Sequence, residues 1–388
     1  MKYLLVSETV TAGVGRHVAS LAEGLHAKGF DTHILHGQQR IDPPFLTFCK
    51  KFCGRIYFAS LPMSRQISLA DIQSIFRVRR YIKKNGPFDI IHGHSAKGGA
   101  IARIAAIGLP SLKVYTPHAF PTMDPDIGLA RRMFYTCIEW GLGQLTDVLI
   151  AVSPGEALHA KNKIRIPVAK IAMVPNGVSL SSVDFEPAEA MPFLDNFEGI
   201  KIVFVGRLWP QKAPERLLDV LAKLGNEGRP YKVWIIGEGP LQESLIQKQD
   251  ELNLNKNIVW VGWQDARRFI HHFDLLVLTS KYETSPITLL EAGAAGTPIL
   301  SMDVDGAELI IEQGYNGYLI PNGDIAAFAE TLSTIINNSD ELSRLKKNAA
   351  SLKWTLSSDR MLEQTLSCYL NKPGHIGLAL ADHSSTYK

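Results

Sequence analysis

Residues 281–300 read KYETSPITLLEAGAAGTPIL, and they follow the apolar run LLVLTS at residues 275–280. The apolar run has the composition of a buried strand. Ser285 and Pro286 then predict a helix start, with Ser285 as the N-cap and Pro286 as the first helical residue. We expect the helix to stop at the GTP turn of residues 296–298. A strand, a short loop and an outward-pointing helix N-terminus are therefore predicted, an arrangement that attracts anions.

Two carboxylates lie around the start of this predicted helix. Glu283 stands in the loop before it, and Glu291 lies about a turn and a half inside it. Carboxylates accept strong hydrogen bonds from sugar and ribose hydroxyls, so both acids can line one site. For an arbitrary pair at this spacing the alternative is two solvated glutamates on a surface helix.

The E-x7-E spacing of Glu283 and Glu291, followed by G-T-P, resembles the signature of a large glycosyltransferase family. This is the retaining family 4, also called the group 1 type, which has the GT-B fold. The resemblance implies two Rossmann-like α/β domains that face each other across a cleft. It implies that Glu283 acts catalytically, and that Ser285, Pro286, Ile287 and Glu291 bind the nucleotide-sugar donor.

The chain length and composition fit such a protein. A chain of 388 residues suits two α/β domains, and 46% hydrophobic with 20% charged residues is typical of a globular protein. No run of eighteen apolar residues occurs, and Glu8 comes too early for a signal peptide, so we expect a cytoplasmic protein. The cysteines Cys49, Cys53, Cys137 and Cys368 have no metal-binding spacing.

The pattern of strands, helices and linkers predicts where the domains begin and end. We expect an acceptor-side N-terminal domain over residues 1–180 and a nucleotide-sugar-binding domain over residues 181–355, after a polar linker at 181–198. The resemblance implies that a helix at 356–371 crosses back to the first domain. Residues 372–388 are polar and are predicted to be a disordered tail.

The first domain opens with a strand at residues 2–7, then a loop with Gly13 and Gly15, then a helix. A dinucleotide site needs G-x-G-x-x-G at this place, and the third glycine is missing, which argues against an NAD site. In the resembled family a glycine-rich loop here approaches the donor phosphates and the acceptor, so Gly13 and Gly15 are assigned to substrate binding. The family's usual Gly-Gly is Ala12-Gly13 in this chain.

His118 stands at the end of a predicted strand in the sequence TPHAF. Ligands bind at strand ends in open α/β sheets. The context resembles the family histidine beside the donor sugar, so we assign His118 a catalytic role. A metal-ligand role is not expected, because no histidine lies at a ligand spacing beside it in the sequence.

Arg207 and Lys212 fall in the pattern G-R-L-x4-K-A-P-E, which matches the family closely. They follow a predicted strand and can clamp a diphosphate, Arg207 as a planar fork and Lys212 as a point charge. The D-x-D of residues 303–305 is assigned to a loop, which fits the usual independence of the resembled family from divalent metal, so the resemblance implies neither a metal nor a cofactor. The cations and the helix dipole then neutralise the leaving diphosphate.

Charge is divided unevenly along the chain. Residues 1–180 carry 22 Lys and Arg against 11 Asp and Glu, a net +11, whereas the remainder carries 19 against 27, a net −8. Residues 71–84 form a predicted helix with an inward stripe, which comprises Ile72, Ile75, Phe76, Val78 and Ile82. Its outward cations are Arg77, Arg80, Lys83 and Lys84. An ordinary covering helix and a membrane-interface helix both fit this pattern.

Together these features predict a retaining, hexosyl-transferring glycosyltransferase. We expect a UDP- or GDP-linked sugar as donor and a hydroxyl of a glycan or lipid-linked acceptor, in cell-surface polysaccharide or lipopolysaccharide biosynthesis. Peripheral binding to an anionic membrane surface, on the inner face of the cell membrane, follows from the basic first half. A sugar-nucleotide epimerase on the same fold is one alternative. A nucleic-acid-binding protein is a weaker one, because the basic half has no recognised module and no aromatic platform, and no nucleic-acid partner is expected.

Overall fold

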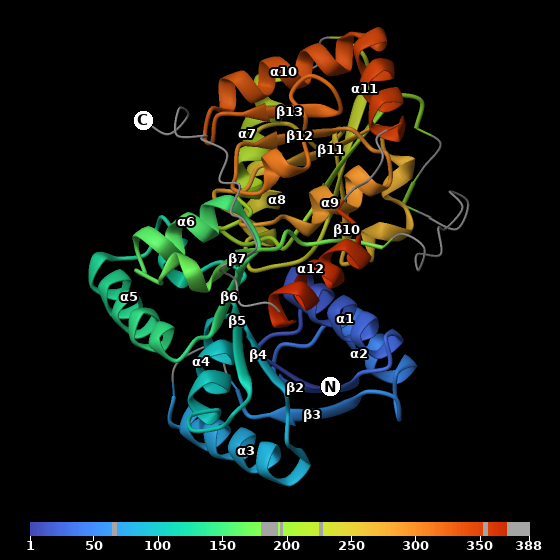
Figure 1. The fold of residues 1–388 in the computed structure, drawn as a ribbon. Helices are drawn as coiled ribbons and strands as arrows, with labels where there is room; N and C mark the ends of the chain where they lie inside the picture. The colour runs from blue at the N-terminus through green and yellow to red at the C-terminus, as the bar shows by residue number, and fades with distance from the viewer. Residues whose placement is uncertain (64–67, 180–192, 195–196, 225–227, 352–355, 371–388) are drawn as a thin grey trace. The chain divides into compact units, whose positions relative to one another are not determined.

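The computed structural model describes residues 1–63, 68–179, 193–194, 197–224, 228–351 and 356–370. It contains two compact units: unit 1 comprises Met1–Gly177 and Leu356–Lys388, and unit 2 comprises Val178–Thr355. Each is a parallel α/β sheet with helices packed against it (Figure 1). The predicted tail at 372–388 and most of the predicted linker at 181–198 lie outside the described residues.

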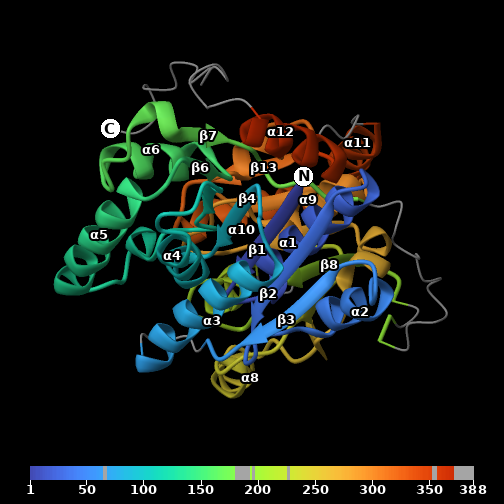
Figure 2. The same cartoon turned by 60° about the horizontal axis from the view of Figure 1, so that its bottom comes forward.

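In unit 1 the described strands run in the order β3-β2-β1-β4-β5-β6-β7, and every pairing is parallel. Their bounds are β1 (Lys2–Ser7), β2 (Asp31–Gly37), β3 (Tyr57–Leu61), β4 (Ile90–His94), β5 (Leu112–Thr116), β6 (Val148–Ala151) and β7 (Ile171–Met173). Figure 2 shows β1, β2 and β3 side by side. The strand order reverses direction between β1 and β4, and such a switch point is where open sheets bind ligands.

Helices cover both faces of this sheet. One core joins Leu21 of α1 (Ala12–Ala27), Phe45 of α2 (Pro43–Lys51) and Met361 of α12 (Ser358–Leu370). A separate core joins Val78 of α3 (Leu69–Asn85) and Ile101 of α4 (Ala96–Ala105). The remaining helices of the unit are α5 (Leu129–Gln144), α6 (Pro154–Asn162), η1 (Pro121–Met123) and η2 (Val168–Lys170).

The C-terminal helix α12 packs on α1 and β6 and so belongs to unit 1. Gly24 of α1 makes this packing possible, because a Cβ there would lie 2.6 Å from Cδ2 of Leu362. Tyr369 of the same helix is buried in the core that α1 shares with the sheet. The last helix therefore completes the hydrophobic core on this face of the first sheet.

In unit 2 the described strands run in the order β10-β9-β8-β11-β12-β13, again all parallel. The strands are β8 (Ile200–Val205), β9 (Tyr231–Ile236), β10 (Ile258–Gly262), β11 (Leu275–Leu278), β12 (Ile299–Met302) and β13 (Gly317–Ile320). The helices are α7 (Pro214–Leu224), α8 (Gln242–Glu251), α9 (Ile287–Ala294), α10 (Ile325–Asn337), α11 (Ser339–Ser351), η4 (Ala266–Arg268), η5 (Ile270–His272) and η6 (Ala307–Leu309). The switch point of this sheet lies between β8 and β11.

The predicted start of α9 is wrong by one residue. Pro286, not Ser285, is the N-cap, and no side chain caps the helix. The ψ angle of Pro286 is 103°, which is extended, and the preceding segment packs against Gly306. A Cβ on Gly306 would lie 2.5 Å from the Thr284 carbonyl oxygen. The predicted stop is confirmed: Gly296 has φ +72°, and the amide of Thr297 donates to the Ala292 carbonyl at 2.9 Å.

The predicted loop at Gly13 and Gly15 is also wrong, because α1 already begins at Ala12. The amide of Ala12 donates to Oδ2 of Asp42 at 2.7 Å, so a side chain from another segment satisfies the helix start. Gly15 is required for packing, since a Cβ there would lie 2.5 Å from the Val10 carbonyl oxygen. Gly13 and Gly15 therefore lie in the opening turn of the helix.

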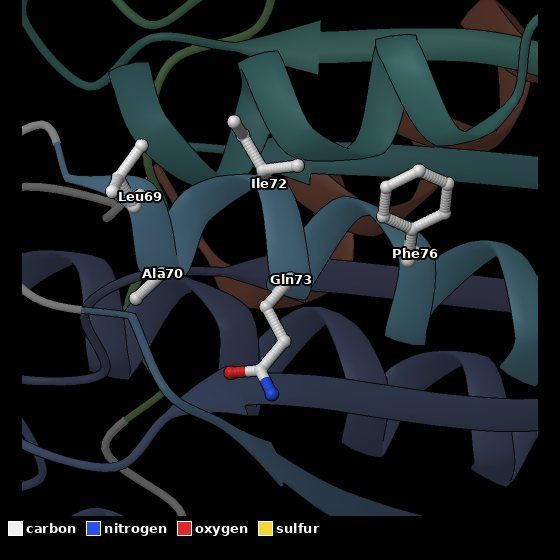
Figure 3. Close-up of a pocket in the computed structure, with 5 residues that line it drawn as sticks. All are labelled: Leu69, Ala70, Ile72, Gln73 and Phe76. Carbon is white, nitrogen blue, oxygen red and sulfur yellow. The ribbon is translucent and has the colours of Figure 1, made fainter.

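The predicted inward stripe of helix α3 is confirmed at Val78 and Ile82, and Ile75 packs against the same core, but the stripe is wrong at two residues. The helix buries Ser74, Val78 and Ile82, whereas the predicted inward residues Ile72 and Phe76 are 53% and 69% exposed. Residues two positions apart on a helix differ by about 200°, so burying 74, 78 and 82 turns 72 and 76 outward. Figure 3 shows them projecting from the helix. The predicted outward cations Arg77, Arg80, Lys83 and Lys84 are exposed.

The helices in the described parts of the chain were compared with the dimensions of a bilayer. None combines the length and the apolar character needed to cross one.

Candidate functional site

The switch point of unit 2 brings together the charged residues that the sequence singled out. Lys212 lies in the loop after β8, and Glu283 lies in the loop after β11. Their side chains form an ion pair, with Nζ of Lys212 2.6 Å from Oε1 of Glu283. The hydroxyl of Ser280 donates to the same oxygen at 2.8 Å. The two charged side chains are only 14% and 10% exposed, so the carboxylate is held rigidly between two donors.

Hydrogen bonds between backbones and side chains tie the two loops together. The amide of Lys281 donates to the Gln211 carbonyl at 2.8 Å, and the Gln211 side chain donates to the Tyr282 carbonyl at 3.2 Å. The Thr279 hydroxyl donates to the Ala213 carbonyl at 3.1 Å. Sequence reasoning missed Gln211 and Thr279, because their partners lie more than sixty residues away along the chain.

Arg207 occupies the same loop as Lys212 but in a different environment. Its side chain is exposed, its guanidinium lies 6.0 Å from the Trp209 ring, and it donates weakly to Oε1 of Gln211 at 3.5 Å. An exposed guanidinium at the mouth of a switch point is available to an anionic ligand.

The loop after β9 packs directly on the loop that carries Arg207. A Cβ on Gly237 would lie 1.9 Å from the Gly206 carbonyl oxygen, and one on Gly239 would lie 2.4 Å from that of Leu208. The Leu208 amide donates to the Glu238 carbonyl at 2.9 Å. Close backbone packing of this kind requires glycine, so these glycines fix the shape of the Arg207 loop.

Helix α9 starts at this switch point and carries the second acid. Glu291 is 0% exposed, and Glu283 is largely buried, so the alternative of two solvated surface glutamates is wrong. Ile287 is the first helical residue and is 8% exposed. The helix N-terminus, with Ser285 and Pro286 before it, therefore follows directly from the loop that holds Glu283.

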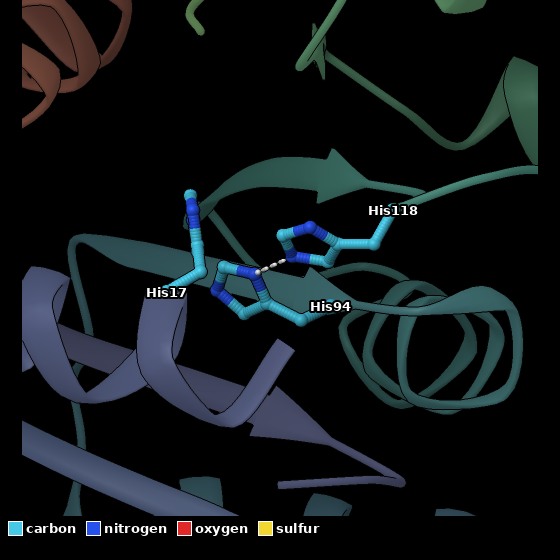
Figure 4. Close-up of side chains that lie close together, drawn as sticks. All are labelled: His17, His94 and His118. Atoms are coloured by element: carbon cyan, nitrogen blue, oxygen red, sulfur yellow. Dashed lines mark hydrogen bonds between the residues drawn. The ribbon is translucent and has the colours of Figure 1, made fainter. Parts of the chain in front are cut away.

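In unit 1 three histidines meet at the switch point between β1 and β4. His17 comes from α1, His94 ends β4, and His118 follows β5 (Figure 4). Nδ1 of His94 and Nε2 of His118 are 3.2 Å apart and share a hydrogen bond. The ring centroids of His17 and His118 are 4.6 Å apart. Sequence spacing did not reveal these neighbours of His118. The relevant signal was that β4 ends in a histidine and that another histidine follows the adjacent parallel strand β5 by two residues.

Buried partners hold this histidine cluster in place. Nδ1 of His17 is 2.8 Å from Oδ1 of Asn176, and Nδ1 of the neighbouring His92 is 2.7 Å from the Tyr369 hydroxyl. Burial lowers the pKa of His17 to about 4, and it also lowers the pKa values of His94 and His118 well below their usual range. The imidazoles are therefore neutral near pH 7, when each offers one donor and one acceptor.

The backbone at this site is held in unusual conformations. His118 and Ala119 have φ angles of +54° and +78°, and Ala12, where the resembled family has glycine, has +48°. Such conformations cost on the order of 1–3 kcal/mol each and persist only where the surroundings impose them. Here the buried carboxylate of Glu156 accepts from the amides of Ala119 and Val152 at 2.7 and 2.8 Å. His118 is thus fixed by its loop as well as by its ring.

Both halves of the chain match known glycosyltransferase families. Residues 11–182 match the family described as Glycosyltransferase Family 4, and residues 193–352 match Glycosyl transferases group 1. The chain is 30% identical over 289 residues to UDP-Gal:alpha-D-GlcNAc-diphosphoundecaprenol alpha-1,3-galactosyltransferase of Escherichia coli, which covers 71% of this chain and 73% of that protein. It is 31% identical to the O-antigen biosynthesis glycosyltransferase WbnH of Escherichia coli, over 65% of this chain and 68% of that one.

Solved structures share the fold. Anabaena Alr3699/HepE in complex with UDP superposes with a TM-score of 0.76 at 18% identity, covering 95% of this chain and 99% of that chain. WaaG, a glycosyltransferase involved in lipopolysaccharide biosynthesis, gives a TM-score of 0.76 at 16% identity, with the same coverage. The predicted GT-B fold is therefore confirmed, and the chain belongs to the family 4, group 1 glycosyltransferases.

Proposed function

We propose that this glycosyltransferase moves a sugar from a UDP- or GDP-linked donor to a hydroxyl of a glycan or lipid-linked acceptor, with retention at the anomeric carbon. The observation that carries this proposal is the Lys212–Glu283 pair at the switch point of unit 2, beside the N-terminus of α9. The names of relatives support it: one uses UDP-galactose and a diphosphoundecaprenol-linked acceptor, and another makes O-antigen. We place the protein in cell-surface polysaccharide or lipopolysaccharide biosynthesis.

On the donor side the protein's own charges neutralise the leaving diphosphate. Arg207 is exposed, and its planar guanidinium donates hydrogen bonds to phosphate oxygens. Lys212 supplies a largely buried point charge. The backbone of Ser285, Pro286 and Ile287 leads into the α9 N-terminus, where the helix dipole favours anions. Transfer then proceeds without a metal, because preorganised cations and dipoles stabilise the developing negative charge.

The two acids have separate tasks. Lys212 and Ser280 both contact Oε1 of Glu283, so we assign Oε2 to a hydroxyl of the transferred sugar. Glu291 holds the ribose hydroxyls of the donor. In unit 1 His118, neutral and fixed by its loop, contacts the transferred sugar, while Gly13 and Gly15 allow the donor or acceptor to approach the backbone.

Unit 1 also carries a surface suited to an anionic bilayer. Leu69 and Phe76 of α3 are 84% and 69% exposed beside the exposed Arg77 and Arg80. Trp140 of α5 is 53% exposed. Exposed apolar side chains next to cations insert at the interface while the cations bind lipid headgroups, at about 1 kcal/mol each. We therefore propose peripheral binding at the cytoplasmic face of the membrane, where a lipid-linked acceptor is presented.

Vesicle sedimentation tests the membrane part. Wild-type protein is expected to bind vesicles with anionic lipid and to be released by salt. Neutralising Arg77, Arg80, Lys83 and Lys84 is expected to abolish binding, whereas neutralising Lys161 and Lys163, exposed on the same unit, is expected to preserve it. Equal partitioning onto neutral and anionic vesicles would contradict the proposal.

A donor screen tests the reaction. Incubation with individual UDP- and GDP-sugars is expected to give slow hydrolysis of one donor, and transfer when a lipid-linked acceptor is added. The anomeric configuration of the product, read by NMR, is expected to be that of the donor. Conversion of the donor to an epimer without an acceptor would favour the epimerase alternative instead.

A further inference from the structure

We propose that His17, His94 and His118 form a three-imidazole site for a divalent ion of the late first transition series, such as Zn²⁺. An ion bound at this site inhibits glycosyl transfer. The binding claim rests on the geometry of unit 1 alone. The inhibition claim also rests on the proposed function, because it depends on the role given to His118.

The spacing of the ring nitrogens fits such an ion. Zn–N bonds of about 2.0–2.1 Å in a tetrahedral site place two ligand nitrogens roughly 3.3 Å apart. Nδ1 of His94 and Nε2 of His118 are already 3.2 Å apart. One nitrogen from each of the three histidines lies within 4.8 Å of the others, so a side-chain shift of roughly 1.5 Å or less brings the three nitrogens to ligand spacing.

The tautomer of His17 is set for ligation. Its Nδ1 is 2.8 Å from the carbonyl oxygen of the Asn176 side chain, so the proton sits on Nδ1 and the lone pair on Nε2. Most histidines that bind a metal donate a hydrogen bond of this kind from the other ring nitrogen, and this bond orients the ring. Among the described residues Nε2 of His17 has no hydrogen-bond partner, although the residue is only 3% exposed.

An unsatisfied buried polar atom costs roughly 1–3 kcal/mol, so the bare Nε2 of His17 indicates an absent partner. On His94 the nitrogen that faces His118 is Nδ1. Its Nε2 lies on the other edge of the ring, has no hydrogen-bond partner among the described residues, and does not bind the same ion. The lowered pKa values of the three imidazoles keep them in the neutral form that binds metals. His118 is partly exposed, which provides an entry path and an open fourth position.

The ligand set selects the ion. Three imidazole nitrogens suit Zn²⁺, Co²⁺, Ni²⁺ or Cu²⁺, whereas Mg²⁺ and Ca²⁺ require oxygen ligands. An ion held by His118 withdraws that ring from the transferred sugar. Binding is therefore expected to slow transfer, which is consistent with a reaction that needs no metal.

Zn²⁺ titration of the full, chelator-treated chain tests the site by calorimetry and by competition with a chromophoric chelator. Saturation at one ion per chain is expected, with Co²⁺ giving the absorption of a tetrahedral complex. His17→Gln, His94→Gln and His118→Gln are each expected to weaken Zn²⁺ binding at least about tenfold, and so is the outer variant Asn176→Ala. The matched control is His159→Gln, which changes a half-buried histidine of unit 1 outside this cluster and is expected to bind as wild type.

Circular dichroism shows whether each variant is folded. Equal Zn²⁺ affinity in the wild type and a folded His17→Gln variant would overturn the site. With the acceptor assay in hand, Zn²⁺ is expected to inhibit transfer, a chelator to reverse this, and Mg²⁺ to have no effect. Zn²⁺ binding with unchanged transfer would overturn the inhibition, and absence of transfer with every donor would overturn the proposed function while the binding result stood.

Discussion

The two units of the chain use the same sheet topology for chemically different sites. At the switch point of unit 1 the polar side chains are histidines, and eight of the ten histidines in the described residues lie in this unit. At the switch point of unit 2 they are a lysine and a glutamate in contact, with an exposed arginine nearby. Burial keeps the first set neutral, whereas in the second set a lysine and a glutamate form an ion pair.

We propose that this difference divides the work of a sugar transferase between the units. A diphosphate needs fixed positive charge, and we assign this task to Arg207, Lys212 and the α9 N-terminus of unit 2. Sugar hydroxyls need neutral donors and acceptors at fixed positions, and we assign this task to the histidines of unit 1. Substitutions in each unit test this division.

The largest effect is expected from Lys212→Ala. Loss of the buried cation removes a contact to the developing anion and leaves the largely buried Glu283 without its charged partner. We expect kcat/KM to fall by the equivalent of ~2–4 kcal/mol, and Arg207→Ala to lose a similar amount. The control is Lys223→Ala, an exposed lysine of the same unit. A folded Lys212→Ala enzyme with wild-type turnover would contradict the assignment.

Substituting Glu283 and Glu291 one at a time tests the separate roles that we propose for them in unit 2. Glu283→Gln is expected to lower kcat with little change in donor KM, because its carboxylate contacts the reacting sugar. Glu291→Gln is expected to raise the donor KM through lost ribose contacts. Each change is expected to cost roughly 1.5–3 kcal/mol, the scale of a charge-assisted hydrogen bond. Steady-state kinetics with varied donor separates these outcomes, and equal effects on KM alone would show that the roles are divided wrongly.

The matching change in unit 1 is His118→Ala. It is expected to lower kcat by about 10- to 100-fold, the range of a positioning hydrogen bond in the transition state. A chelator is expected to leave wild-type turnover unchanged, because we assign no metal to the reaction. Full activity of the folded variant, or loss of wild-type activity with a chelator, would refute this role.

The smallest effect concerns stability in acid. Burial lowers the pKa of His159 in unit 1 to about 4. Below about pH 6.5 the unfolded state then binds more protons than the folded state, so this contribution is present above pH 6.5 and is lost as the pH falls toward 4. Because His159 is partly exposed, solvent screening reduces the loss to about 1 kcal/mol at pH 5.

Chemical denaturation of wild type and His159→Gln at pH 7 and pH 5 measures this effect. The variant is expected to lose less free energy of unfolding between the two pH values. An identical loss in both proteins would contradict the role assigned to the buried neutral ring.

Local sequence was sufficient for most of the fold and for the residues of unit 2. The strand before Glu283, the loop, and the stop at Gly296 follow from short-range rules, and the structure confirms them. The start of α9 was predicted one residue too early, and the segment before it packs against the distant Gly306, a contact that no short-range rule contains. The start of α1 was also missed, and the side chain that accepts from its Ala12 amide belongs to the distant Asp42.

Contacts between distant segments could not be predicted. Lys212 and Glu283 were each identified by motif, but their contact depends on β8 and β11 lying side by side. The neighbours of His118 likewise depend on the pairing of β4 with β5. Periodicity alone also did not show that Ser74 of α3 is buried while Ile72 and Phe76 are exposed.

Calorimetric titration of UDP and GDP into the full chain tests whether unit 2 alone holds the nucleotide. Three forms are compared: the wild type, Lys212→Ala and His118→Ala. We expect one of the two nucleotides to bind the wild type. Lys212→Ala is expected to weaken the affinity for that nucleotide at least about tenfold, and His118→Ala is expected to leave that affinity unchanged. Equal losses in both variants, or no loss in Lys212→Ala, would contradict the division of labour between the two units.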